Sequence, residues 1–208
     1  MYKFNRPILG LLLFLGSCNA AFSQEDEKKQ KVPISLAITN HSWSFPFSQV
    51  FRLNPFHPGL EAGTEWCYKE KEKFKFYQAA DIGGFINRSS GSAIYMNLNL
   101  GIRAKFKFGL RADFAFGLGY FHGFHPSFIY TQSIDGTYQQ SKDKGVGSLA
   151  ANFKMGLGFE LPESNRELTL FGAYQWMVST SYWSLITIRP NGLLHIGVKA
   201  NLFKSYKS

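Results

Sequence analysis

The chain of 208 residues carries 23 Lys and Arg against 14 Asp and Glu, a formal net charge of +9, and 17% of its residues are aromatic. Its length suits one domain, and its two cysteines, Cys18 and Cys67, exclude a disulfide-rich scaffold. No apolar stretch approaches the roughly 20 residues that a transmembrane helix needs, which excludes a helical membrane protein.

The N-terminus has the layout of an export signal. Basic Lys3 and Arg6 precede an apolar run at 8–15, and small residues follow up to position 23. We expect residues 1–23 to be removed as a signal peptide, with a lipobox ending at Cys18 as the alternative cleavage site. Without Lys3 and Arg6 the net charge is +7. For an exported chain, this charge favours anionic lipid head groups over nucleic acid as a partner.

The remainder of the chain is organised around strands. Residues 24–32 are polar and of mixed charge, and we expect a flexible leader there. Over the domain at 33–208, apolar residues recur at every second position, which is typical of strands with one apolar face. Eight segments show this pattern, in chain order at 33–41, 58–69, 73–87, 94–106, 108–120, 147–161, 166–179 and 193–203.

The second face of these strands decides what the apolar face contacts. In 108–120, bulky apolar residues alternate with Gly, Ala and a few charged residues. Small residues with scattered charges suit the crowded interior of an eight-stranded barrel, whose lumen side chains can fill. The sequence therefore predicts an all-β, eight-stranded antiparallel up-and-down transmembrane β-barrel. A lipocalin-like barrel with its apolar face inward is the alternative.

Loop lengths and aromatic positions agree with a membrane barrel. Long connections at 42–57, 121–146 and 180–192 alternate with short polar turns, as expected when both termini lie in the periplasm. Aromatic residues gather at strand ends, as in membrane-interface girdles: Trp66, Tyr68, Phe74, Phe76, Phe106, Phe108 and Phe159 at the periplasmic end, and Tyr120 and Trp176 at the outer end. Over 33–203 the chain resembles the small outer-membrane β-barrel proteins of Gram-negative bacteria. The resemblance implies an outer-membrane location and carries no activity.

Charged residues on the lumen face form the first candidate site. Six acids oppose seven bases: Glu61, Glu65, Asp81, Asp113, Glu160 and Glu167 against Lys69, Lys75, Arg103, Lys105, Arg111, Lys154 and Lys199. Since an unpaired buried charge costs several kcal/mol, we expect these groups to pair and close the lumen. Asp113, near Arg111 and Arg103, is the predicted pairing centre. A narrow conduit for small solutes is the alternative.

The outer loops form the second candidate site because they are unusually aromatic. The predicted rim comprises Trp43, Phe45, Phe47, Phe51, Arg52, Phe56, Phe121, Phe124 and Trp183, with Phe128, Tyr130 and Tyr182 nearby. These side chains could pack on each other as a lid, or bind lipid, an apolar ligand or a protein partner. Arg52 and Arg189 would suit the phosphates of lipopolysaccharide.

A third pattern suggests chemistry. His125 and Ser127 form an H-x-S arrangement that resembles the motif of lipid A deacylases, and the resemblance implies an acyl-ester hydrolase with Asp135 or Asp143 as the acid. His41, His57, His122 and His125 fall at the outer end but have no recognised metal-ligand spacing. We therefore predict no metal or cofactor, and a non-enzymatic structural or interaction role, with the hydrolase as an alternative.

Overall fold

The computed structural model describes residues 32–42, 56–126, 129–132, 135–161, 168–180 and 188–203. The predicted signal peptide and most of the leader lie outside these residues. Within the described ranges, no helix has the length and apolar character needed to cross a membrane.

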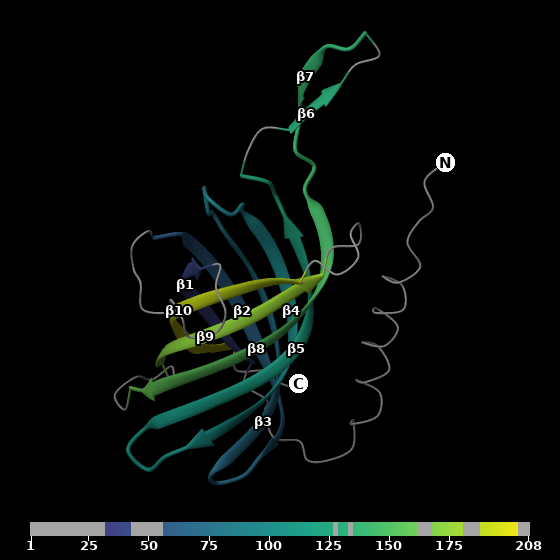
Figure 1. Ribbon diagram of the computed structural model, residues 1–208. Helices are drawn as coiled ribbons and strands as arrows, with labels where there is room; N and C mark the ends of the chain where they lie inside the picture. Colours follow the sequence, from purple (N-terminus) through teal and green to yellow (C-terminus); the bar gives the residue numbers. More distant parts are fainter. Residues whose placement is uncertain are drawn as a thin grey trace. The chain divides into compact units, whose positions relative to one another are not determined.

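Eight antiparallel strands form one closed barrel (Figure 1). Each barrel strand pairs with the barrel strands before and after it, and β1 (Val32–Ser42) closes the sheet by pairing with β10 (Ile188–Phe203), where Ile38 lies opposite Ile196. The barrel strands are β1 (Val32–Ser42), β2 (Pro58–Glu70), β3 (Phe74–Phe85), β4 (Ala93–Lys105), β5 (Leu110–Gly123), β8 (Val146–Glu160), β9 (Thr169–Thr180) and β10 (Ile188–Phe203). The predicted eight-stranded up-and-down topology is confirmed.

The apolar face of the strands points outward. On β4, the side chains of Ile94, Met96 and Leu100 are more than half exposed, whereas those of Asn97 and Asn99 are almost fully buried. A barrel with polar groups inside and Leu, Ile and Phe outside is suited to a hydrocarbon surrounding, because water would leave this whole exterior unburied. The lipocalin-like alternative is therefore wrong.

Small residues inside the barrel are required by space. A Cβ atom on Gly117 would lie 2.0 Å from the Leu98 carbonyl oxygen and 2.3 Å from Asn99 Oδ1. On Gly119 it would lie 2.1 Å from Asn97 Oδ1. The glycines on the inner face of β5 thus make room for the polar side chains of β4, which explains the alternation at 108–120.

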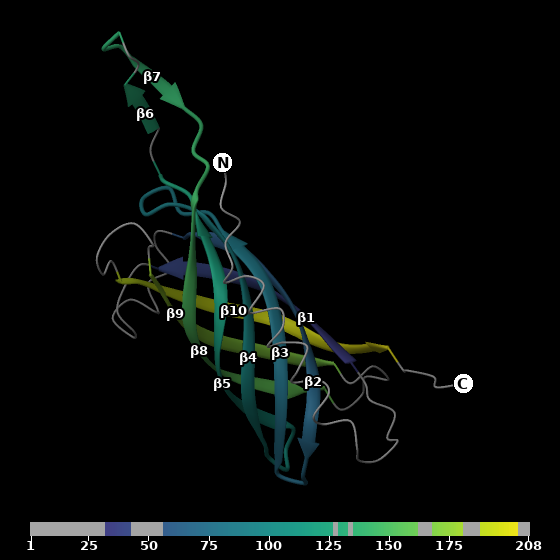
Figure 2. The same ribbon diagram turned by 90° about the vertical axis from the view of Figure 1, so that its right-hand side faces the viewer.

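Two segments differ from the predicted elements. β10 begins at Ile188, because Arg189 and Pro190 pair with β9, whereas pairing with β1 reaches only to Gly192. Pro190 therefore lies where only one side of the strand is paired, a position that proline tolerates. The predicted loop at 121–146 contains a hairpin, β6 (Ile129–Gln132) and β7 (Tyr138–Ser141), beyond the ends of β5 and β8 (Figure 2).

A β-bulge changes the face of one predicted lumen residue. The β2–β3 register shifts between Cys67 and Lys69, so that Lys69 lies opposite the outward-facing Phe76. Because an extra residue reverses the alternation that follows it, Glu70 occupies the inner position instead. The placement of Lys69 in the lumen is corrected.

The outward face can be tested on β4. We expect Leu100→Arg to destabilise the inserted barrel by about 2–4 kcal/mol, because an ionised side chain near the bilayer midplane loses its hydration. The measurement is urea unfolding in phosphatidylcholine vesicles, followed by gel mobility without boiling. Leu100→Ile, which keeps an apolar side chain, serves as the control. Equal stability of the two variants would contradict the outward placement.

Candidate functional site in the lumen and at the long-loop end

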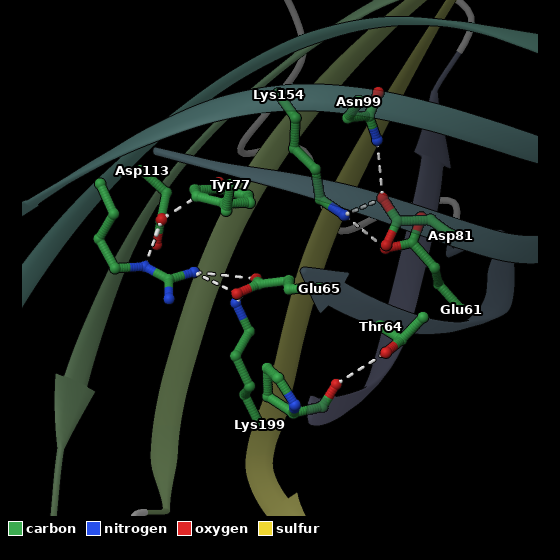
Figure 3. Close-up of polar contacts among 11 residues, drawn as sticks. Glu61, Thr64, Glu65, Tyr77, Asp81, Asn99, Asp113, Lys154 and Lys199 are labelled. Carbon is green, nitrogen blue, oxygen red and sulfur yellow. Dashed lines mark hydrogen bonds and ion pairs between the residues drawn. The ribbon is translucent and has the colours of Figure 1, made fainter. Parts of the chain in front are cut away.

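Arg103 of β4 is the centre of the first buried charge cluster, whose members Glu65 and Asp113 are labelled in Figure 3. Its side chain is 2% exposed, its Nε donates to Asp113 Oδ1 at 2.6 Å, and its Nη2 donates to Glu65 Oε1 at 2.9 Å. Lys199 also pairs with Glu65, and the Tyr77 hydroxyl donates to Asp113 Oδ1 at 3.2 Å. Each charge therefore has an opposite charge beside it, which offsets the loss of water.

Lys154 of β8 holds a second cluster (Figure 3). Its Nζ lies 2.6 Å from Glu61 Oε1 and 3.5 Å from Asp81 Oδ2. The amide of Asn99 donates to Asp81 Oδ2 at 2.8 Å, and the Tyr95 hydroxyl donates to Glu61 Oε2 at 3.0 Å. The carboxylates of Glu61 and Asp81 thus share one ammonium group, and each also accepts a hydrogen bond from an uncharged donor.

Most of the described lumen residues predicted from the sequence form two charge clusters or take part in two separate ion pairs. Glu61, Glu65, Asp81, Arg103, Asp113, Lys154 and Lys199 meet in the two clusters just described. Arg111 does not join Asp113; it pairs with Glu160 instead, and Lys105 pairs with Glu70. The pairing centre is therefore Arg103 rather than Asp113, because Arg103 lies opposite Asp113 in the β4–β5 register and also reaches Glu65.

Several lumen residues were not identified from the sequence. Tyr77 supplies a hydroxyl donor, and fully buried His195 places its Nδ1 3.3 Å from Glu61 Oε1. The weak alternation at 73–87 gave no signal that Tyr77 points inward.

Apolar side chains fill the lumen at the end opposite the Arg111–Glu160 pair. The buried cluster contains Phe85, Ala93, Tyr95, Phe121, Ala150, Met177 and Leu193. The ring of His41 stacks on Phe85 at 3.8 Å between centroids, and its ring nitrogens bond Asn191 and Asn87. Phe121 is 6% exposed. Its placement on the outer rim is corrected, because the alternation of β5 turns Phe121 inward between outward-facing Tyr120 and His122.

A small internal space remains between the charge clusters. Its volume is about 50 Å³, and its lining includes Glu65, Asp81, Asp113, Lys154 and Lys199. This is room for a few water molecules, each of which needs polar partners such as these. The middle of the barrel is thus occupied mainly by paired side chains.

The long-loop end, formed by the connections β1–β2, β3–β4, β5–β8 and β9–β10, carries the described part of the predicted rim. Phe56, Tyr130 and Tyr138 are more than half exposed. At the base of the hairpin, the Tyr120 hydroxyl bonds His122 Nδ1 at 2.9 Å, and the ring of Phe124 packs against His122. The remaining rim residues lie outside the described residues: Trp43, Phe45, Phe47, Phe51, Arg52 and Trp183.

Asp143 fixes the backbone beside His125. Its carboxylate accepts hydrogen bonds from the backbone amides of Gly145 at 2.8 Å and His125 at 2.6 Å, which hold the pKa of Asp143 below its usual range. The distance from Asp143 Oδ2 to His125 Nδ1 is 3.8 Å, too long for a hydrogen bond. Ser127 lies outside the described residues, so no acid, histidine and serine arrangement is established.

Histidines in the described ranges form no metal centre. No group of three or more His, Cys, Asp and Glu side chains that could hold a metal occurs there. His41 is held by two asparagines, and His122 bonds the Lys144 carbonyl oxygen.

The buried cluster around Arg103 can be tested by mutation. Arg103→Gln should destabilise the barrel by about 3–5 kcal/mol, because it leaves Glu65 and Asp113 without their common partner. Lys105→Gln, two residues along the same inner face, removes a partly exposed pair and should cost less than about 1 kcal/mol. The free energy of unfolding of both variants is to be measured by urea unfolding of the full chain in vesicles. Equal losses of stability in the two variants would show that the buried Arg103 cluster stabilises the barrel no more than the partly exposed Lys105 pair does.

Comparison with known families finds no match, and no curated protein is similar in sequence. Solved structures with a similar fold include surface protein A of Neisseria (12% identity, 86% of this chain, 100% of that chain, TM-score 0.47). They also include the Yersinia pestis attachment invasion locus protein Ail (13%, 83%, 99%, 0.49) and the N-terminal β-barrel domain of Pseudomonas aeruginosa OprF (12%, 83%, 98%, 0.44). These similar structures are small outer-membrane β-barrels. Independently of them, the closed register and the outward apolar face make this chain an eight-stranded transmembrane β-barrel.

Proposed function

We propose that the protein is an integral outer-membrane barrel with a closed lumen, no enzymatic activity and a binding surface at its long-loop end. The observation that carries this proposal is the filled interior, in which buried charges pair across the barrel below an apolar layer. A barrel without a pathway through it acts through its surface, and the exposed long-loop end is the surface that projects from the membrane.

The exterior supports placement in a membrane. Outward-facing apolar side chains occur on every barrel strand, for example Ile38 on β1, Ile82 on β3 and Leu157 on β8, each at least half exposed. Spanning by a closed barrel satisfies all backbone groups within the sheet. Together with the predicted export signal, this favours the outer membrane, with the short turns and both termini on the periplasmic side.

Chemistry at the long-loop end favours lipopolysaccharide as a partner. The exposed cations Arg88, Lys142, Lys144 and Arg189 lie at the same end of the barrel as the hairpin that exposes Tyr130 and Tyr138. Cationic side chains bind phosphate groups, and tyrosine provides rigid contact area with a polar tip. The long-loop end therefore combines the two features that a phosphorylated glycolipid surface requires.

Closure of the lumen predicts an absence of conductance. In planar bilayers, the reconstituted full chain should show no stepwise current at any voltage, because Arg103 and Lys154 with their carboxylate partners occupy the interior. Heat-modifiable gel mobility confirms that the reconstituted protein is folded. A conducting porin, reconstituted in the same way, checks the bilayers. Reproducible unitary currents would favour a conduit instead.

Binding to lipopolysaccharide predicts a selective effect of three cations. The triple variant Arg88→Gln, Lys142→Gln and Lys144→Gln should lose most of the thermal stabilisation that lipopolysaccharide gives the folded barrel over neutral lipid, at about 1 kcal/mol per cation. The measurement is the unfolding temperature in vesicles with and without lipopolysaccharide. A variant lacking Lys69, Lys71 and Lys107 at the other end should keep the effect. If the first variant keeps it too, this surface does not bind lipopolysaccharide.

A further inference from the structure

The bulge in β2 exposes a lysine among aromatic side chains. Lys69 lies opposite Phe76 on the outer face, next to Tyr68, whose hydroxyl bonds the side chain of Gln78. Trp66 precedes them on the same face. Without the register shift, Lys69 would point into the lumen with the other charges. The bulge thus places a cation where the exterior is otherwise apolar.

Further lysines lie at the same end of the barrel, in the short turns. Lys71 and Lys73 belong to the β2–β3 turn and Lys107 to the β4–β5 turn, and all three are exposed. The two turns are neighbours, because the Lys105 amide donates to the Lys73 carbonyl oxygen at 2.8 Å. Cations from separate hairpins therefore gather on one sector of the barrel end.

Most described acidic residues at this end of the barrel already form ion pairs with other cations. Glu70 pairs with Lys105, and Glu160 pairs with Arg111. Among the described residues, Lys69, Lys71, Lys73 and Lys107 have no such ion pair, and Glu72 is the acid that remains between them. This sector consequently has an excess of positive charge that an anion could neutralise.

Aromatic side chains at the strand ends indicate at which level of the bilayer these lysines lie. Tyr68, Phe74, Phe76, Phe106 and Phe159 are all 43–47% exposed and face outward near the short turns. Phe106 stacks against Phe108, which is 68% exposed. Aromatic side chains at strand ends occupy the level between hydrocarbon and head groups. A lysine in a turn just beyond this level can extend its ammonium group to lipid phosphates while its alkyl stem covers apolar surface.

We propose that this sector, formed by Lys69, Lys71, Lys73 and Lys107 with the surrounding aromatics, is a binding site for the phosphate head group of an anionic phospholipid. The inference rests on the proposed membrane placement and adds a ligand at the end opposite the lipopolysaccharide surface. Acyl chains would lie along the outward face of β2 and β3, where Ile82 and Phe76 are exposed. The head group would then meet the lysines from the side, through the membrane.

Native mass spectrometry of the full chain in detergent tests this site. The folded barrel is mixed with equal amounts of phosphatidylglycerol and phosphatidylcholine of the same acyl chains, and retained lipids are counted. Wild type should retain phosphatidylglycerol preferentially. Lys69→Gln should lower that preference about fivefold, since one surface cation contributes about 1 kcal/mol. Lys69→Arg, which keeps the positive charge, should retain the preference. Inorganic phosphate added to the solution should not displace the lipid.

Matched variants distinguish this site from general charge. Replacing Lys69, Lys71 and Lys107 together by Gln should abolish the preference for phosphatidylglycerol. Replacing Arg88, Lys142 and Lys144 at the long-loop end by Gln should leave that preference unchanged. Equal loss in both variants, or no preference in wild type, would overturn the inference. Heat-modifiable mobility is measured for every variant. A wild-type chain that never forms the folded barrel would refute the proposed function itself, whereas a folded barrel without lipid preference refutes only this site.

Discussion

Pairing of charges inside a narrow barrel is the constraint on which the rest of the structure depends. An apolar exterior leaves the interior as the place for most charged side chains of the strands, and there is little water there to solvate them. Arg103 satisfies two carboxylates from neighbouring hairpins, and Lys154 joins β8 to Glu61 and Asp81 across the interior. Because each cation contacts acids from different strands, these contacts also fix the strands relative to one another.

Charge pairing leaves room for little else. Glycines on the inner face of β5 allow the asparagines of β4 to enter, and Tyr77 and Tyr95 extend across to carboxylates on other strands. Above the charges, an apolar layer around Phe85 and Phe121 separates them from the long-loop end. The described interior is thus occupied mainly by contacts among the barrel's own side chains.

The two ends differ in chemistry. At the long-loop end, a polar hairpin with Tyr130 and Tyr138 stands on a base held by Asp143, whose carboxylate binds two backbone amides. At the short-turn end, aromatic side chains and lysines share one sector because a single bulge turns Lys69 outward. A barrel with a different surface at each end fits a bilayer whose two leaflets differ in their head groups.

Alternation along the chain predicts the eight strands, the outward apolar face and the charged residues of the two lumen clusters, because strand alternation is a local property. It did not determine the partners, since contacts such as Lys154 with Glu61 cross the lumen between strands that are not adjacent. Nor did it show that Lys69 points outward or that Phe121 points inward. Both depend on register, on a bulge for Lys69 and on the full length of β5 for Phe121, and register is established only when the sheet closes.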